Sequence, residues 1–201
     1  KPAGVDALVD FIARVCGCAP DLPYYYYHIP RMSGVSPDLV EFMQKACERV
    51  PRFHGIKFSD FFLADLTTCL EFEDGRLDVL FGSDEMILSG LATGAKGMVG
   101  STYCVAAPLF AKVIEAFESG RMEEAQNWMG KCVRLIRLLD TQPGPYHSCL
   151  KQVVWPLLGL DPGPCRLPQA VLNGEETAHA RSLLEASGFA SELTSGEFNL
   201  P

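Results

Sequence analysis

The 201-residue sequence has few positive charges and no long apolar run. Lys and Arg number 17 against 25 Asp and Glu, so the formal net charge is −8 and the pI is about 5.0. Proteins that bind nucleic acid or anionic lipid carry clustered basic residues, whereas the basic residues of this chain are scattered. No apolar run reaches the ~20 residues that span a bilayer. We therefore expect neither a nucleic acid nor a membrane as a partner.

A secretion signal and paired metal ligands are also missing from the sequence. Residues 1–6 lack the basic-then-apolar layout of a signal peptide, so we expect a cytoplasmic protein. The four histidines have no paired spacing and are expected in structural or surface roles. Cys16 and Cys18 are separated by one residue, where zinc sites have roughly two to four. The sequence therefore predicts no metal site.

The composition that is present is typical of a globular protein. Hydrophobic residues make up 48% and charged residues 21% of the chain, which provides enough apolar side chains for a core. Most of the eight cysteines lie inside apolar periodic segments, where a reduced Cys packs as a small hydrophobic residue. We therefore interpret the cysteines as free thiols.

Short apolar segments alternate with amphipathic segments four times along the chain. Strands are predicted at residues 22–30, 55–59, 77–81 and 97–101. Helices are predicted at residues 5–16, 61–70, 86–93, 106–117 and 122–139. One more helix is predicted to begin with Ser36 as its N-cap and Pro37 in its first turn, and to end before Pro51. Short apolar strands joined by helices are typical of a parallel sheet with right-handed crossovers. The fold class is therefore α/β.

The composition of the sequence changes at residue 141. Six prolines follow within 28 residues, and helical stretches are expected near 149–158 and 175–187. We predict that residues 141–201 form a helical C-terminal extension to the α/β part, residues 1–140.

Polar residues mark the ends of all four predicted strands, where parallel sheets carry their functional groups. Lys57 lies between Ile56 and Phe58 in a short strand. Desolvation there would lower the pKa of its amine toward that of a neutral nucleophile, which can form an imine. The alternative is that the Lys57 ammonium extends into solvent, as in many strand lysines. Spacing alone favours that alternative.

Two other strand ends offer groups that could assist such an amine. The phenol of Tyr27, on the neighbouring strand, could transfer a proton, although aromatic side chains in strands more often only pack. Asp84 and Glu85 follow Gly82-Ser83 and could hold a polyhydroxylated ligand. The alternative is that Ser83 or Asp84 caps the following helix and that Glu85 lies in its first turn.

Taken together, four motifs resemble those of a known enzyme family. They are Tyr25-Tyr26-Tyr27-His28-Ile29-Pro30 with Ser33-Gly34-Val35, then Gly55-Ile56-Lys57-Phe58-Ser59-Asp60, Gly82-Ser83-Asp84-Glu85 and Gly100-Ser101-Thr102-Tyr103. In order and spacing they resemble the N-acetylneuraminate lyase branch of the dihydrodipicolinate synthase superfamily, which consists of pyruvate-dependent aldolases. The resemblance covers essentially the whole chain.

This resemblance implies a class I aldolase that cleaves sialic acid into N-acetylmannosamine and pyruvate. Lys57 would form the Schiff base, and Tyr27 would donate and accept the proton. The residues implied to contact the sugar are Ser59, Gly82, Asp84, Glu85 and Ser101. No cofactor is implied, because the protonated imine is itself the electron sink.

The resemblance also implies a fold. The family fold is a (β/α)8 TIM barrel of ~250 residues, and residues 1–140 would be the C-terminal half that carries strands five to eight, followed by the C-terminal helices. Full-length relatives are tetramers, so a homo-oligomer is implied. Missing from this half are a glycine-threonine turn that holds the substrate carboxylate and a tyrosine from a neighbouring subunit. Because half a barrel exposes two edge strands, we expect it to be unstable or to pair with another half.

Two other interpretations stay open at this point. The chain could be another member of the superfamily, such as a dihydrodipicolinate synthase, which would use a different aldehyde; an arginine for the carboxylate of that aldehyde is expected at Met32. Alternatively, the chain could be a truncated, catalytically inactive form that associates with full-length subunits.

Overall fold

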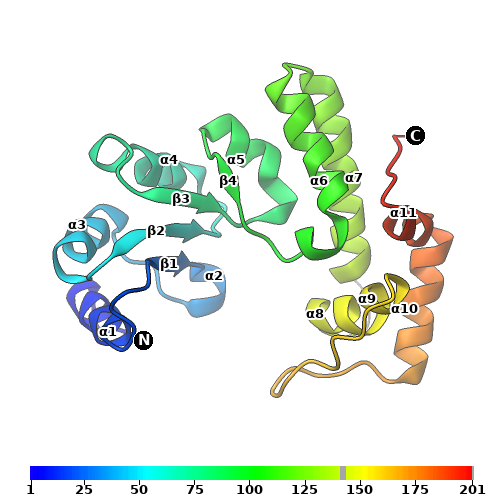
Figure 1. Cartoon of the computed structure of the whole chain (residues 1–201), viewed down its shortest axis with the longest axis horizontal. Helices are drawn as coiled ribbons and strands as arrows, with labels where there is room; N and C mark the ends of the chain where they lie inside the picture. The colour runs from blue at the N-terminus through cyan, green and yellow to red at the C-terminus, as the bar shows by residue number, and fades with distance from the viewer. Residues whose placement is uncertain (141–143, 201) are drawn as a thin grey trace. The chain divides into compact units, whose positions relative to one another are not determined.

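The computed structural model describes residues 1–140 and 144–200. The chain forms two compact units, Lys1–Gly100 and Ser101–Pro201 (Figure 1). The first unit contains the β-sheet with its helices, and the second is helical. The predicted boundary between residues 140 and 141 falls at residues 141–143, outside the described residues, and stays a prediction.

A four-stranded parallel sheet forms the centre of the first unit. Its strands are β1 (Tyr24–His28), β2 (Phe53–Phe58), β3 (Asp78–Phe81) and β4 (Gly97–Met98), in the order β1-β2-β3-β4. Tyr27 pairs with Lys57, which pairs in turn with Leu80. The predicted α/β class with a parallel sheet is thus confirmed.

Strand β4 is shorter than the predicted strand at residues 97–101. The Val99 N–H still donates to the Phe81 carbonyl oxygen at 2.9 Å, but the ladder then ends. At Gly100 the backbone lies against the Asp84 carboxylate, and an added Cβ would be 1.6 Å from Asp84 Oδ1. The ladder ends there because β3 itself ends at Phe81, which pairs with Met98.

Helices connect the strands of the first unit. They are α1 (Val5–Gly17), α2 (Pro30–Ser33), α3 (Leu39–Arg49), α4 (Leu63–Glu71) and α5 (Ile87–Thr93), with 3₁₀ turns η1 (Phe72–Asp74) and η2 (Asp84–Met86). The N-cap of α3 is Asp38, whose carboxylate accepts a hydrogen bond from the Glu41 N–H at 2.9 Å. The prediction of Ser36 as the cap was wrong, because helical dihedrals begin at Leu39.

Side chains alternate between the two faces of the sheet, as the pleat of a strand requires. One face is fully buried against the helices; its core includes Tyr26, Ile56, Phe58, Val79 and Phe81 from the strands and Val9, Phe42, Met43, Ala46 and Leu66 from the helices. On the other face Tyr25, Lys57 and Leu80 are half-buried and Tyr27 is exposed. The polar face is therefore the one that carries Lys57.

A tyrosine crosses this polar face from β1 to β3. The Tyr25 hydroxyl donates to Asp78 Oδ2 at 2.6 Å, and this hydrogen bond raises the pKa of Tyr25 to about 12. The ring passes over Gly55 of β2, where an added Cβ would be 2.7 Å from Tyr25 Cε1. The side chain thus links two strands that do not pair with each other.

We expect Tyr25→Phe to lower the free energy of unfolding by about 1–2 kcal/mol, because a hydrogen bond to a charged acceptor is lost. Urea unfolding monitored by circular dichroism measures this change. Tyr24→Phe is the matched control, since Tyr24 is a half-buried neighbour in the same strand, and its effect should stay within about 0.5 kcal/mol. Equal effects of the two substitutions would contradict the role of the Tyr25–Asp78 bond.

The second unit consists of helices and connecting segments. They are α6 (Tyr103–Glu118), α7 (Met122–Asp140), α8 (Tyr146–Cys149), the π-helical turn η3 (Leu150–Val154), α9 (Trp155–Leu157), α10 (Gly174–Ala186) and α11 (Phe189–Ser195). Lys131 of α7 is buried and bonds both Glu192 of α11 and the Asn199 carbonyl oxygen. This lysine fixes the end of the described chain to α7.

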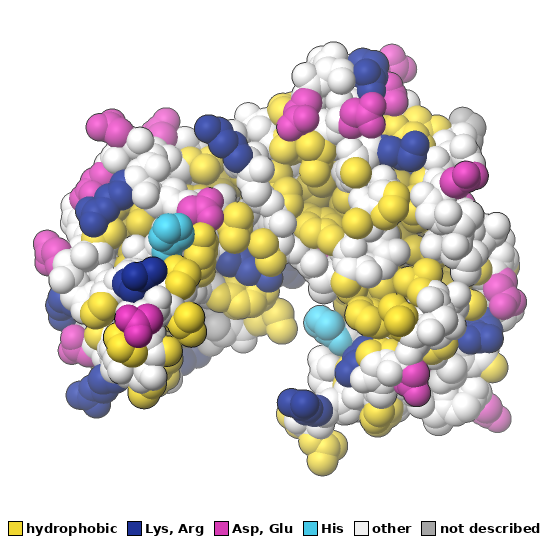
Figure 2. Space-filling view, viewed as in Figure 1, with side chains coloured by type: hydrophobic (Ala, Val, Ile, Leu, Met, Phe, Trp, Pro, Cys, Tyr) yellow, Lys and Arg dark blue, Asp and Glu magenta, His cyan; other side chains and the backbone are white. Residues whose placement is uncertain are grey.

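Three further findings bear on the sequence predictions. All eight cysteines are free thiols, as predicted. Across residues 1–140 and 144–200, no helix is long and apolar enough to cross a membrane. Figure 2 shows Lys and Arg side chains interspersed with Asp and Glu on the face in view, as their scattered positions in the sequence predict.

Candidate active site

The carboxyl ends of β1, β2 and β3 bring four of the predicted site residues to one edge of the sheet. These three arrows point in the same direction in Figure 1. Tyr27 is the fourth residue of β1, and Lys57 pairs with it on β2. Ser59 and Gly82 directly follow β2 and β3. Parallel pairing is what places these residues together, since each strand ends at the same edge.

The side chains of Lys57 and Tyr27 lie next to each other on the polar face of the sheet. Lys57 is half-buried between the fully buried Ile56 and Phe58. Its Nζ lies 4.2 Å from the centroid of the Tyr27 ring, a distance at which the ring face attracts a cation. Tyr27 is 47% exposed, so its ring is no part of the core. The lysine side chain therefore lies along the phenol ring.

Ser59 and Gly82 lie on the other side of Lys57. A Cβ added to Gly82 would be 2.0 Å from Ser59 Oγ and 2.9 Å from Lys57 Cε, so the missing side chain leaves room for both. The Gly82 N–H donates to the Phe58 carbonyl oxygen at 2.7 Å, which continues the pairing of β2 and β3. A side chain at position 82 would fill the space beside the amine.

The Ser59 hydroxyl has no hydrogen-bond partner among the described residues, although its Oγ is buried. A buried polar atom without a partner costs about 1–3 kcal/mol, so such atoms are uncommon and often belong to binding sites. Ser59 is therefore able to hydrogen-bond a ligand placed beside Lys57.

Asp84 and Glu85 form the first part of η2. Asp84 is 6% exposed and packs on Gly100, whereas Glu85 is exposed. Ser83 precedes the turn and makes no capping hydrogen bond with its side chain. The capping role considered for Ser83 is thus not observed, and both carboxylates stay predicted ligand contacts.

Ser101 is the first residue of the second unit. It is exposed, and its carbonyl oxygen accepts a bond from Cys104 Sγ at 2.8 Å. Its place in the substrate site stays a prediction.

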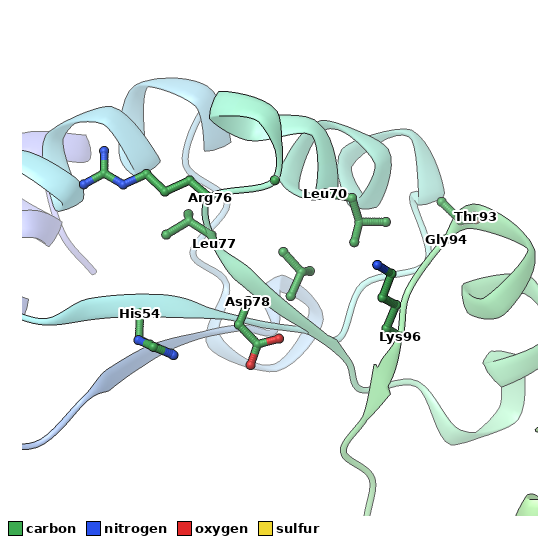
Figure 3. A pocket seen from close by; sticks show the side chains of 10 residues that line it. His54, Leu70, Arg76, Leu77, Asp78, Thr93, Gly94 and Lys96 are labelled. Atoms are coloured by element: carbon green, nitrogen blue, oxygen red, sulfur yellow. The ribbon is translucent and has the colours of Figure 1, made fainter.

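An open pocket of about 460 Å³ lies at the opposite end of the sheet (Figure 3). It is lined by residues at the amino ends of β2, β3 and β4, including His54, Leu77, Asp78 and Lys96. Functional groups of parallel α/β folds lie at the carboxyl ends of strands. We therefore place the candidate site at the Lys57 edge of the sheet.

One pair of residues near the site had no predicted function. His28, the last residue of β1, is 1% exposed, and neither ring nitrogen has a hydrogen-bond partner among the described residues. Its Nε2 lies 4.0 Å from Oδ2 of Asp60. Burial lowers the pKa of His28, opposed by the charges of Asp60 and Asp65. No signal in the sequence indicated that this ring is buried, because its burial depends on tertiary packing.

Comparison with known proteins gives three consistent findings. N-acetylneuraminate lyase A of Xenopus laevis is 38% identical over 84% of this chain and 54% of its own length. The N-acetylneuraminate lyase of Rattus norvegicus is 36% identical over 95% of this chain and 60% of its own length. The solved N-acetylneuraminate lyase of Proteus mirabilis is 37% identical, with a TM-score of 0.86, over 94% of this chain and 63% of that chain.

The chain thus spans 54% to 60% of the length of these two curated relatives. Its likeness to the solved structure confirms the predicted fold class, part of a (β/α)8 barrel with helices after it. The model of the Dihydrodipicolinate synthetase family matches residues 3–187. On this match, which covers most of both units, the chain belongs to the Dihydrodipicolinate synthetase family.

Proposed function

We propose that this chain carries the Schiff-base half of a class I aldolase that cleaves N-acetylneuraminate to N-acetylmannosamine and pyruvate. The observation that carries the proposal is the group formed by Lys57, Tyr27, Ser59 and Gly82 at one edge of the sheet. Relatives named N-acetylneuraminate lyase at 36–38% identity support this substrate over the aldehyde of a dihydrodipicolinate synthase. Met32, where the synthase would need an arginine, agrees with this choice.

The geometry suits imine chemistry at Lys57. Its amine would attack the C2 ketone of open-chain sialic acid, and loss of water would leave an iminium cation at the same nitrogen. The face of the Tyr27 ring, 4.2 Å from Nζ, would stabilise that positive charge. The C3–C4 bond then breaks, and its electron pair moves into the iminium to form an enamine.

Proton transfer completes the reaction. The Tyr27 oxygen, in its deprotonated form, would take the proton of the C4 hydroxyl as the aldehyde of N-acetylmannosamine forms, which leaves Tyr27 as the phenol. The Tyr27 phenol then returns this proton to C3 of the enamine, which becomes an iminium again, and water releases pyruvate and the free Lys57 amine. The exposure of Tyr27 leaves its hydroxyl accessible to a substrate. No cofactor enters this sequence of steps.

The polyol part of the substrate needs several hydrogen-bonding groups. Ser59 Oγ supplies a buried hydroxyl that has no hydrogen-bond partner among the described residues, and the missing side chain of Gly82 makes room for it. Asp84, Glu85 and Ser101 are the further contacts that we propose from the resemblance. The eight free thiols support a reducing, cytoplasmic location, and we propose a homo-oligomer as the active form.

The proposal is tested by trapping the imine. The purified chain is incubated with pyruvate and reduced with borohydride, and the modified peptide is identified by mass spectrometry. We expect one adduct, on Lys57, because reduction converts the imine to a stable secondary amine. A parallel sample without pyruvate should show none.

The fold must be checked in the same sample, since the chain covers only part of its relatives. Far-UV circular dichroism and size-exclusion chromatography establish whether the sample is folded. If a folded sample gives no adduct, the chain alone is not an enzyme, and the inactive, associating form becomes the better interpretation. Adducts spread over several exposed lysines would equally contradict a specific nucleophile.

A further inference from the structure

His28 and Asp60 form a pair on the back of the candidate active site. His28 directly follows Tyr27 in the chain, and Asp60 directly follows Ser59. Because side chains alternate along a strand, the His28 side chain lies on the buried face when Tyr27 lies on the polar face. The Ser59 N–H donates to the His28 carbonyl oxygen at 2.8 Å. The backbone of His28 thus holds Ser59 directly.

The His28 ring is enclosed by apolar groups. Its centroid lies 5.2 Å from that of Phe58 and 6.1 Å from that of Tyr26. The charged groups that act on the ring are Asp60, after β2, and Asp65, on α4. Asp60 is the nearer in the structure, with Oδ2 4.0 Å from Nε2, beyond hydrogen-bond distance. A small movement of Asp60 would close this distance.

Protonation of the ring would supply the force for that movement. An imidazolium and a carboxylate in an apolar environment attract each other more strongly than in water, and the orphan ring N–H would gain an acceptor. Asp60 also accepts a hydrogen bond from the Phe61 N–H at 2.8 Å, so its carboxylate is attached to the loop after Ser59. A shift of Asp60 is therefore transmitted to Ser59.

We propose that His28 is a positioning residue that, together with Asp60, sets the position of the Ser59 hydroxyl beside Lys57. With the ring neutral, Ser59 holds the position seen in the structure, next to Gly82. With the ring protonated, Asp60 moves toward the ring and takes Ser59 out of that position. The importance of this shift for a substrate rests on the proposed function, but the coupling itself does not.

The coupling can be measured by NMR without any substrate. In labelled protein, the His28 ring resonance and the Ser59 amide resonance are followed from pH 8 down. Because burial lowers the pKa of His28, we expect the ring to titrate below its usual value of about 6.5. The Ser59 amide should follow with the same midpoint.

Asp60→Asn is the decisive variant, because it removes the charge and keeps the shape of the side chain. It should abolish most of the Ser59 shift, and Asp60→Glu should restore part of it. His54→Gln is the matched control, since His54 is exposed at the opposite end of β2, and it should leave the Ser59 titration unchanged. A Ser59 amide that does not follow the His28 ring, or that follows it equally in Asp60→Asn, would overturn the inference.

The two proposals fail separately. Loss of the common titration overturns the role of His28 even in a chain that traps pyruvate on Lys57. Conversely, a chain that shows the common titration and traps no pyruvate contradicts the proposed function, whereas the His28–Ser59 coupling stands. A substitution of the buried His28 could prevent folding, and the NMR experiment does not need one. It uses only the wild-type chain and conservative variants of Asp60, which is half-buried.

Discussion

Lys57→Met is expected to abolish the borohydride-trapped pyruvate adduct and to lower sialic acid cleavage by about 10⁴-fold or more. Methionine retains the unbranched aliphatic stem that lies beside Gly82 but has no amine to attack a ketone. Because the proposed function places the covalent intermediate on this nitrogen, no other residue of the group should be able to replace it. Mass spectrometry and the release of N-acetylmannosamine measure the two losses.

Lys57→Arg separates charge from nucleophilicity. A guanidinium keeps a cation against the Tyr27 ring, 4.2 Å from Nζ in the wild type, but it stays protonated and forms no imine. Both Lys57 variants should therefore lose the adduct equally. Adduct formation in Lys57→Arg would show that the trapped amine is elsewhere.

Lys96→Met is the matched control. Lys96 is an exposed lysine that precedes β4 and lines the pocket at the amino ends of the strands. It lies at the wrong end of the sheet for the proposed chemistry, so its substitution should leave the Lys57 adduct unchanged. If Lys96→Met removed the adduct, the amino-end pocket of Figure 3 would become the reactive site.

The alternating apolar pattern was sufficient to predict the sheet and the neighbourhood of Tyr27 and Lys57. Period-2 and period-3.6 patterns reflect which side chains are buried, and parallel pairing then fixes which strand ends are adjacent. These two facts predict that Tyr27 and Lys57 lie on neighbouring strands, and the structure adds the register in which they pair. The length of β4 was overestimated, because its apolar residues continue to Val99 whereas the partner strand β3 ends at Phe81, which pairs with Met98.

The pattern of apolar residues could not predict contacts between residues that are far apart in the sequence. The orphan hydroxyl of Ser59 and the buried ring of His28 depend on which atoms surround them in three dimensions. A single histidine after four tyrosines gives no sign that neither ring nitrogen has a hydrogen-bond partner within residues 1–140 and 144–200. The N-cap of α3 could not be predicted from the sequence either. Ser36 and Asp38 are both favourable N-cap residues, and the structure shows that the helix begins after Asp38.

Gly55→Ala is expected to destabilise the chain by about 3 kcal/mol or more, the upper end of the usual cost of overpacking. An added Cβ would lie 2.0 Å from the Asp78 carbonyl oxygen and 2.7 Å from Tyr25 Cε1. The first contact is with backbone, so β3 itself must move, and the Tyr25–Asp78 hydrogen bond is disturbed as well. Urea unfolding measures the loss, and the soluble yield reports a chain that no longer folds.

Gly17→Ala is the matched control for this substitution. Gly17 ends α1, and an added Cβ there has no described atom within 4 Å apart from its own chain neighbours and helix backbone. Alanine has the higher helix propensity, so the free energy of unfolding should stay within about 1 kcal/mol of the wild type. The difference in stability between the two variants bears on the proposed site, since Lys57 lies two residues beyond Gly55 on the same face of β2. If Gly55→Ala were as stable as Gly17→Ala, the close approach of β3 and Tyr25 to β2 at Gly55 would be wrong.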